Sequence, residues 1–124
     1  MRPKSIIFSF AVVFLISCHS SRKSTITKID KTYLKENVTG KDVQLVDVRT
    51  QEEYESGHID DAVNFNIIDN ETFLEQIEAL DKGEPVYLYC KMGGRSNRAA
   101  QLLKDQGFVE IYDYSGGYND WVTD

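Results

Sequence analysis

One cysteine, Cys90, stands at the junction of an apolar run and a basic, glycine-containing loop. The run is Pro-Val-Tyr-Leu-Tyr at residues 85–89, and the loop is Cys-Lys-Met-Gly-Gly-Arg-Ser at residues 90–96. Backbone N–H groups in such a loop, and those of a helix that begins directly after it, place partial positive charge beside the sulfur. That charge favours the thiolate, which is the nucleophilic form of cysteine. The pattern therefore predicts a reactive thiol rather than a cysteine that only fills the core.

We expect the loop to form the binding surface around the sulfur, with contributions from Lys91, Met92, Gly93, Gly94, Arg95 and Ser96. Lys91 and Arg95 would attract an anionic substrate, although solvated surface charge is an alternative role for both. Met92 is expected at the mouth of the pocket. Ser96 has two interpretations: its hydroxyl donates to the sulfur, or it caps the helix that follows.

The spacing between Cys90 and Arg95 separates two kinds of cysteine chemistry. Four residues lie between them, whereas cysteine phosphatases need five, because their loop wraps a phosphate whose oxygens the arginine binds. A loop one residue shorter fits a single additional sulfur atom better than a tetrahedral phosphate. The spacing therefore favours sulfur chemistry, with a phosphatase as the less favoured alternative.

Composition indicates a single globular domain that can bury a core. The chain has 124 residues, 41% of them hydrophobic, and a formal net charge of −6 from 14 basic and 20 acidic side chains. An acidic surface argues against nucleic acid as a partner, because nucleic-acid binding depends on neutralising phosphates. With only two histidines we expect no metal site, since zinc takes three or four protein ligands, and we expect no cofactor.

Residues 1–17 are typical of a bacterial secretion signal. Arg2 and Lys4 precede an apolar segment at residues 6–16, which is shorter than the ~20 residues that a membrane-spanning helix needs. Leu-Ile-Ser-Cys at residues 15–18 resembles a lipobox, which predicts a lipidated Cys18 and an exported domain anchored to a bacterial membrane and facing the periplasm. An ordinary signal peptide or a short anchor is the alternative. Residues 18–27 would then form a flexible tether.

Short strands that alternate with helices predict an α/β domain at residues 28–124. Strands are expected at residues 43–48, 63–66, 85–89 and 109–112, and helices at residues 31–37, 51–56, 95–106 and, ending the chain, around Trp121. A further helix is expected to be capped by Asn70 and ended by Gly83. This alternation is typical of a mostly parallel sheet of about five strands with helices on both faces.

The carboxyl ends of parallel strands meet at one edge of a sheet, where ligands bind in such folds. Asp47, Arg49 and the Cys90 loop all follow predicted strands, so we expect them to share one rim. Asp47 and Arg49 are expected to form an ion pair that supports this rim. The sequence thus predicts one site, centred on Cys90, at the carboxyl edge of the sheet.

Six segments together resemble the single-domain rhodaneses, a family of sulfurtransferases, over residues 26–121. They are Leu-Val-Asp-Val-Arg (45–49), Glu-Glu-Tyr (52–54), Gly-His-Ile (57–59), Ala-Val-Asn (62–64), the Cys90 loop (90–96) and Gly-Gly-Tyr-Asn-Asp-Trp (116–121). Each segment is weakly specific, but six in order with compatible spacing are highly specific. One departure is Asp61, where the family usually has glycine, and a positive φ at this position would be strained.

The resemblance implies a ping-pong transfer of sulfane sulfur through a persulfide on Cys90. The donor would be a small sulfur anion such as thiosulfate, and the acceptor a thiol or cyanide. His58 is implied to be a packing and hydrogen-bonding residue near the rim rather than a partner of the cysteine, and the domain is expected to be a monomer. A rhodanese-like module that binds a partner or senses sulfur species without catalysis is the rival interpretation; such modules usually lack the cysteine that this chain retains.

Overall fold

Five parallel strands form the centre of the fold in the computed structural model, which describes residues 23–124. The strands are β1 (Thr25–Ile29), β2 (Gln44–Asp47), β3 (Val63–Asn64), β4 (Val86–Tyr89) and β5 (Glu110–Tyr114). Their order in the sheet is β1-β5-β4-β2-β3, and every neighbouring pair is parallel. The predicted α/β architecture is confirmed, and β4 lies in the middle of the sheet with β2 on one side and β5 on the other.

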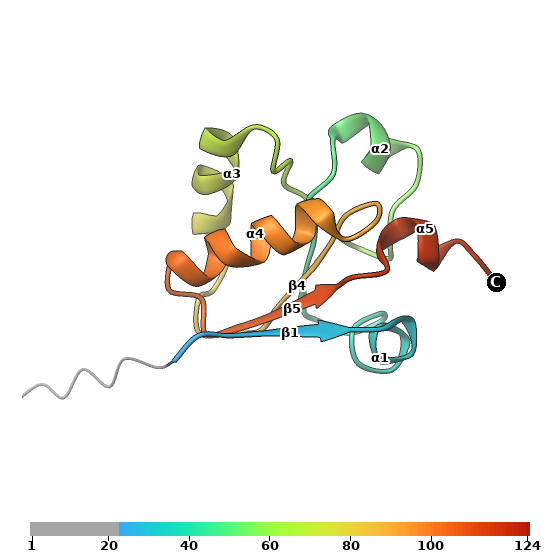
Figure 1. Cartoon of the computed structure of the whole chain (residues 1–124), viewed down its shortest axis with the longest axis horizontal. Helices are drawn as coiled ribbons and strands as arrows, with labels where there is room; N and C mark the ends of the chain where they lie inside the picture. The colour runs from blue at the N-terminus through green and yellow to red at the C-terminus, as the bar shows by residue number, and fades with distance from the viewer. Residues whose placement is uncertain (1–22) are drawn as a thin grey trace, which may run out of the picture.

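Helices cover both faces of this sheet. They are α1 (Lys31–Asn37), α2 (Gln51–Glu55), α3 (Asn70–Gln76) with the 3-10 turn η1 (Ile77–Ala79), α4 (Gly94–Asp105) and α5 (Gly117–Trp121). Figure 1 shows α3 and α4 on one side of the sheet and α1 on the other. The core is accordingly in two parts, one between the sheet and α3 and α4, the other between the sheet and α1 and α5. Among residues 23–124, no helix is long and apolar enough to cross a bilayer.

Strand β1 corrects the expected start of the domain. Residues 25–27 fall within the expected flexible tether, but they belong to a strand that pairs with β5 from Thr25↔Glu110 to Ile29↔Tyr114. Three of the five strand residues are exposed, because β1 is an edge strand, so the segment has little of the apolar periodicity that marks a buried strand. The predicted signal peptide, the lipidation site Cys18 and the first part of the tether lie outside the described residues.

The short-range signals for helix starts are mostly confirmed. Asp30 caps α1 by accepting from the Tyr33 N–H, and Thr50 and Glu53 form a reciprocal capping box at the start of α2. The cap of α3 is Asp69 rather than Asn70, since the Asp69 carboxylate accepts from the Thr72 N–H. This helical segment also ends earlier than Gly83, at the end of η1.

In the turn after α2, the residue with a strained, positive φ is Asp60, one position before Asp61, where such strain was considered. Within the described chain, Asp60 is the one non-glycine residue with a positive φ, 48°, and Asp61 is not in that region. The Asp60 carboxylate accepts a hydrogen bond of 2.9 Å from the Gly40 N–H, which compensates part of the cost of this conformation. Asp61 in place of the usual glycine therefore does not strain the backbone.

Candidate active site

The Cys90 loop runs from the end of β4 to the start of α4 and is held from outside by α5. The Tyr118 N–H donates to the Cys90 carbonyl at 2.7 Å, and the Asn119 N–H donates to the Lys91 carbonyl at 3.1 Å. The approach is close because Gly117 (φ 68°) has no side chain: a Cβ there would lie 2.5 Å from the Lys91 carbonyl oxygen. Helix α5 thus binds the loop carbonyls, while N–H groups of the same loop are free to turn toward the sulfur.

Hydrogen bonds from the loop favour the thiolate of Cys90. The Gly93 N–H donates to Sγ at 3.0 Å, and the Ser96 Oγ lies 3.6 Å from Sγ. Burial raises the pKa of the thiol, but the Ser96 hydroxyl and the backbone N–H groups of Ser96, Met92 and Gly93 outweigh it and hold this pKa below its ordinary value. Gly93, with φ 97°, is the N-cap of α4, so the N-terminus of a 12-residue helix also faces the sulfur.

Ser96 lies inside α4 rather than at its cap, which decides between its two interpretations. Its hydroxyl donates to the Gly93 carbonyl at 3.2 Å and is the side chain that meets the sulfur. The residue is fully buried, and the N-cap position belongs to Gly93. The Ser96 side chain is therefore part of the sulfur environment, and the capping interpretation is wrong.

Arg95 is engaged differently from what the sequence suggested. Its guanidinium forms two parallel hydrogen bonds to Glu53 on α2, Nη1 to Oε1 at 2.7 Å and Nη2 to Oε2 at 3.0 Å. The arginine lowers the pKa of Glu53 to about 2, and the carboxylate in turn raises the pKa of Arg95. The guanidinium is therefore committed to fastening α4 to α2.

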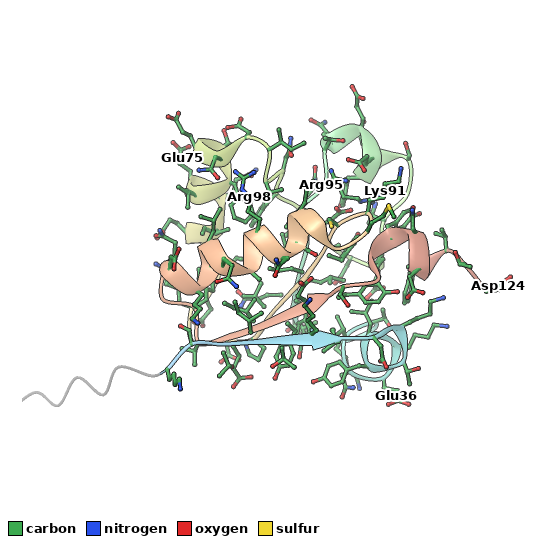
Figure 2. The ribbon with its side chains drawn as sticks, in the orientation of Figure 1. Glu36, Glu75, Lys91, Arg95, Arg98 and Asp124 are labelled. Atoms are coloured by element: carbon green, nitrogen blue, oxygen red, sulfur yellow. The ribbon has the colours of Figure 1, made fainter. Side chains whose placement is uncertain are left out.

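Lys91, Met92 and Gly94 are the exposed members of the loop, and Met92 is 73% exposed. Figure 2 shows Lys91 and Arg95 at the same end of the molecule, where α4 starts near α2 and α5. Lys91 is thus the basic side chain of the loop that is not committed to an ion pair among the described residues. Gly94 is exposed and has space around it.

The predicted support of the rim is present in the structure. Arg49 binds Asp47 in a buried ion pair, with Nη2 2.7 Å from Oδ2, and it also donates to the Gly57 carbonyl. The guanidinium carbon of Arg49 lies 4.2 Å from the ring centre of Tyr118, which connects the pair to α5. His58 is exposed and stacks on Tyr54 with ring centres 4.0 Å apart, well suited to the packing role expected of it.

Cys90 is only 1% exposed, so a reagent reaches its sulfur only if the loop moves. The residue lies in the apolar core beneath α4, with Lys91 and Met92 outside it. This burial is the main structural argument against a reactive thiol, and the lowered pKa is the main argument for one.

The structure adds three residues that sequence reasoning did not assign to the site. Glu53 belongs to one of the six segments of the family resemblance, and in the structure it both caps α2 and binds Arg95. Gly117 belongs to another of these segments, and in the structure it permits the contact between α5 and the loop. Asp113 is a fully buried acid on β5, and the sequence did not distinguish it from the exposed Glu110 of the same strand. No cluster of three or more metal-ligating side chains forms within residues 23–124.

Comparison with known proteins gives consistent matches. The family model described as "Rhodanese-like domain" matches residues 30–124. The chain is 36% identical to protein YqhL of Bacillus subtilis over 118 residues, covering 94% of this chain and 88% of that protein. It is 40% identical to the thiosulfate sulfurtransferase GlpE of Shewanella oneidensis over 81 residues, covering 65% and 77% respectively. A solved rhodanese-like domain protein of Staphylococcus aureus superposes with a TM-score of 0.67 at 30% identity, covering 77% of this chain and 90% of that one.

Proposed function

Because this chain belongs to the rhodanese-like family, we propose that it is a sulfurtransferase whose Cys90 carries a sulfane sulfur as a persulfide. The observation that supports this most directly is the position of Sγ, which accepts the Gly93 N–H at 3.0 Å inside a loop that lowers the pKa of the thiol. Relatives named thiosulfate sulfurtransferase share 38–40% identity with the chain. Retention of the cysteine in the four-residue spacing to Arg95 agrees with this chemistry.

In the first half of the proposed cycle, the Cys90 thiolate attacks the outer sulfur of a donor such as thiosulfate. A new S–S bond forms to Sγ, the S–S bond of the donor breaks, and sulfite leaves with the electron pair. The N–H groups that hold the thiolate then hold the charge of the persulfide, so no general base is required for this step. In the second half, a thiol or cyanide attacks the terminal sulfur, and the thiolate of Cys90 is restored.

A non-catalytic module is the second candidate, and the burial of Cys90 favours it. If the loop stays closed, a thiol that is 1% exposed meets neither donor nor acceptor, and the domain is left with its outer surface for binding. The lowered pKa of Cys90 would then have no consequence for turnover. The two candidates differ in one measurable property, which is whether the folded protein accepts a sulfur atom.

The test is the intact mass of the purified chain after incubation with thiosulfate, compared with that of Cys90→Ala. The proposal predicts a gain of one sulfur atom in the wild type only, removed again by cyanide or a thiol. Cys90→Ala is a close control, since it shortens the side chain without adding a polar group. No adduct, together with slow alkylation of Cys90 in the folded state, would establish the non-catalytic module. Turnover of an aryl phosphate without an adduct would establish a phosphatase instead.

A further inference from the structure

Tyr118 of α5 connects the sulfur loop to the rim of the sheet. Its backbone N–H donates to the Cys90 carbonyl at 2.7 Å, while the centre of its ring lies 4.2 Å from the guanidinium carbon of Arg49. Figure 1 shows α5 beside the loop that joins β4 to α4. The backbone of this one residue therefore contacts the loop, and its side chain contacts the rim where β2 ends.

Arg49 is a fixed support for this ring. The residue is 3% exposed, and its guanidinium binds the Asp47 carboxylate, with Nε 3.0 Å from Oδ1 and Nη2 2.7 Å from Oδ2. Nη2 also donates to the Gly57 carbonyl at 2.7 Å. A cation attracts an aromatic ring more strongly when it is shielded from water, as Arg49 is. The ring of Tyr118 thus packs against a buried cation that the sheet holds in place.

The hydroxyl end of the same ring is confined by the turn after α2. It lies against Gly57, where a Cβ would collide with the Tyr118 hydroxyl. Gly57 also has a φ of 149°, so any other residue at this position would be strained. The ring therefore occupies the space between Arg49 and Gly57, and a side chain at residue 57 would push it off the cation.

The position of α5 determines where the N–H groups of the loop point. The Tyr118 N–H binds the Cys90 carbonyl, and at 3.1 Å the Asn119 N–H binds the Lys91 carbonyl. In a trans peptide the C=O and N–H groups point in opposite directions. The Met92 N–H, which shares a peptide plane with the Lys91 carbonyl, is therefore turned away from α5. It is one of the backbone groups that lower the pKa of the thiol.

We propose that Tyr118 is a positioning residue: its ring, held on Arg49, fixes α5 where α5 orients the N–H groups of the loop toward Cys90 Sγ. The side chain acts on the sulfur through the loop and not by contact with it. The buried pair of Asp47 and Arg49 therefore acts on the thiol as well as supporting the rim. The inference rests on the proposed function in that the thiolate of Cys90 is the nucleophile, but it is tested without sulfur transfer.

The measurement is the pH profile of Cys90 alkylation by iodoacetamide, read by intact mass. Tyr118→Leu releases α5 from Arg49, so the pKa of the thiol should return toward that of a free cysteine. The midpoint should rise by about half a pH unit, which is about a threefold loss of thiolate below the midpoint. Tyr118→Phe keeps the ring and should stay near the wild-type midpoint.

These variants change no charge, so a shift of the midpoint reports the orientation of the loop. The charged and titratable groups on the elements around the thiol all remain: Lys91 of the loop, Arg95 of α4 with its partner Glu53, Arg49 with Asp47 at the rim, and Asp113 of β5.

A second pair of variants tests the contact from the other side of the ring. Gly57→Ala places a methyl group against the Tyr118 hydroxyl and should raise the midpoint as Tyr118→Leu does. Adding Tyr118→Phe removes the colliding hydroxyl, so the midpoint should return most of the way to the wild-type value. The backbone strain of alanine at residue 57 persists, so the free energy of unfolding should recover only in part. This difference separates the position of α5 from a general loss of stability, and it does not require Tyr118→Leu to fold.

Tyr112→Leu is the matched control. Tyr112 is also a half-buried tyrosine in aromatic contacts, with ring centres 5.9 Å from Tyr33 and 4.9 Å from Tyr87, but it belongs to β5. Its loss should lower the free energy of unfolding and leave the midpoint unchanged. An unshifted midpoint in folded Tyr118→Leu, an equal shift in Tyr112→Leu, or no recovery in the double variant would each overturn the inference. The expected shifts in a chain that accepts no sulfur would instead refute the proposed function alone.

Discussion

At the scale of single residues, the pair of Glu53 and Arg95 replaces the substrate contact that the sequence suggested for the arginine. Both side chains are 28% exposed, and the guanidinium fork uses both carboxylate oxygens. Glu53 also receives the Thr50 N–H and hydroxyl. One carboxylate therefore caps α2 and fastens it to the first turn of α4, next to the cysteine loop.

This pair gives a prediction about acid stability. The pKa of Glu53 is about 2 in the folded chain against about 4.3 unfolded, so its contribution is complete above the unfolded value and is lost as pH falls toward 2. Allowing for solvent screening, Glu53→Gln should lower the free energy of unfolding by about 1–2 kcal/mol at pH 7, and by progressively less below pH 4. Urea titrations across this range measure the difference. Glu55→Gln, on the exposed side of the same helix, is the control, and an equal pH dependence in both variants would contradict the prediction.

At the scale of elements, the sulfur site depends on the contact between α5 and the loop after β4. Gly117→Ala would place a Cβ 2.5 Å from the Lys91 carbonyl oxygen at a positive φ, so α5 and the loop must separate. We expect a loss of about 2–3 kcal/mol in the free energy of unfolding and a higher midpoint for Cys90 alkylation, because the loop N–H groups lose their alignment. Denaturant titration and alkylation kinetics measure the two effects.

Gly107→Ala separates backbone strain from this contact. Gly107 also has a positive φ, 90°, but apart from its two neighbours in the chain, no described residue has an atom within 4 Å of the position of its Cβ. Gly107→Ala should therefore lower the free energy of unfolding by about 1 kcal/mol and leave the pH midpoint of Cys90 alkylation unchanged. If both glycine variants shifted the midpoint equally, the contact with α5 would have no role in holding the thiolate.

Elements with strong local signals could be predicted from the sequence, and contacts between elements could not. The capping box of α2 and the glycine that ends α4 are read from neighbouring residues, so α2 and α4 were placed within a residue or two. Strand β1 was missed because an exposed edge strand lacks a clear pattern. The position of Asp113 opposite Leu88 requires that β5 lie beside β4, and a strand order that departs from chain order is set by the whole fold rather than by any local segment.

At the scale of the whole molecule, the net charge of −6 opposes the approach of an anionic donor to the loop. No acidic residue precedes Asp30, so every acidic side chain of the chain lies within residues 30–124. This repulsion is screened beyond ~8 Å at physiological salt, where the local charge of Lys91 becomes decisive. The reaction with thiosulfate should therefore speed up several-fold when ionic strength rises from low to physiological, while reaction with a neutral trisulfide should not change. Stopped-flow measurements of persulfide formation provide the two rates.

Lys91→Glu tests the local part of this electrostatic balance, and Lys104→Glu is its matched control. Both variants change the net charge by the same amount, but Lys104 lies in the last turn of α4, at the opposite end of the helix from the loop. Lys91→Glu should slow persulfide formation from thiosulfate by about tenfold and from a trisulfide far less, because only the anion gains from a cation beside the sulfur. Lys104→Glu should slow persulfide formation from thiosulfate only slightly, because it changes the overall charge of the protein but not the charge at the loop. Equal slowing of both donors by Lys91→Glu would show that the lysine acts by shaping the loop and not by its charge.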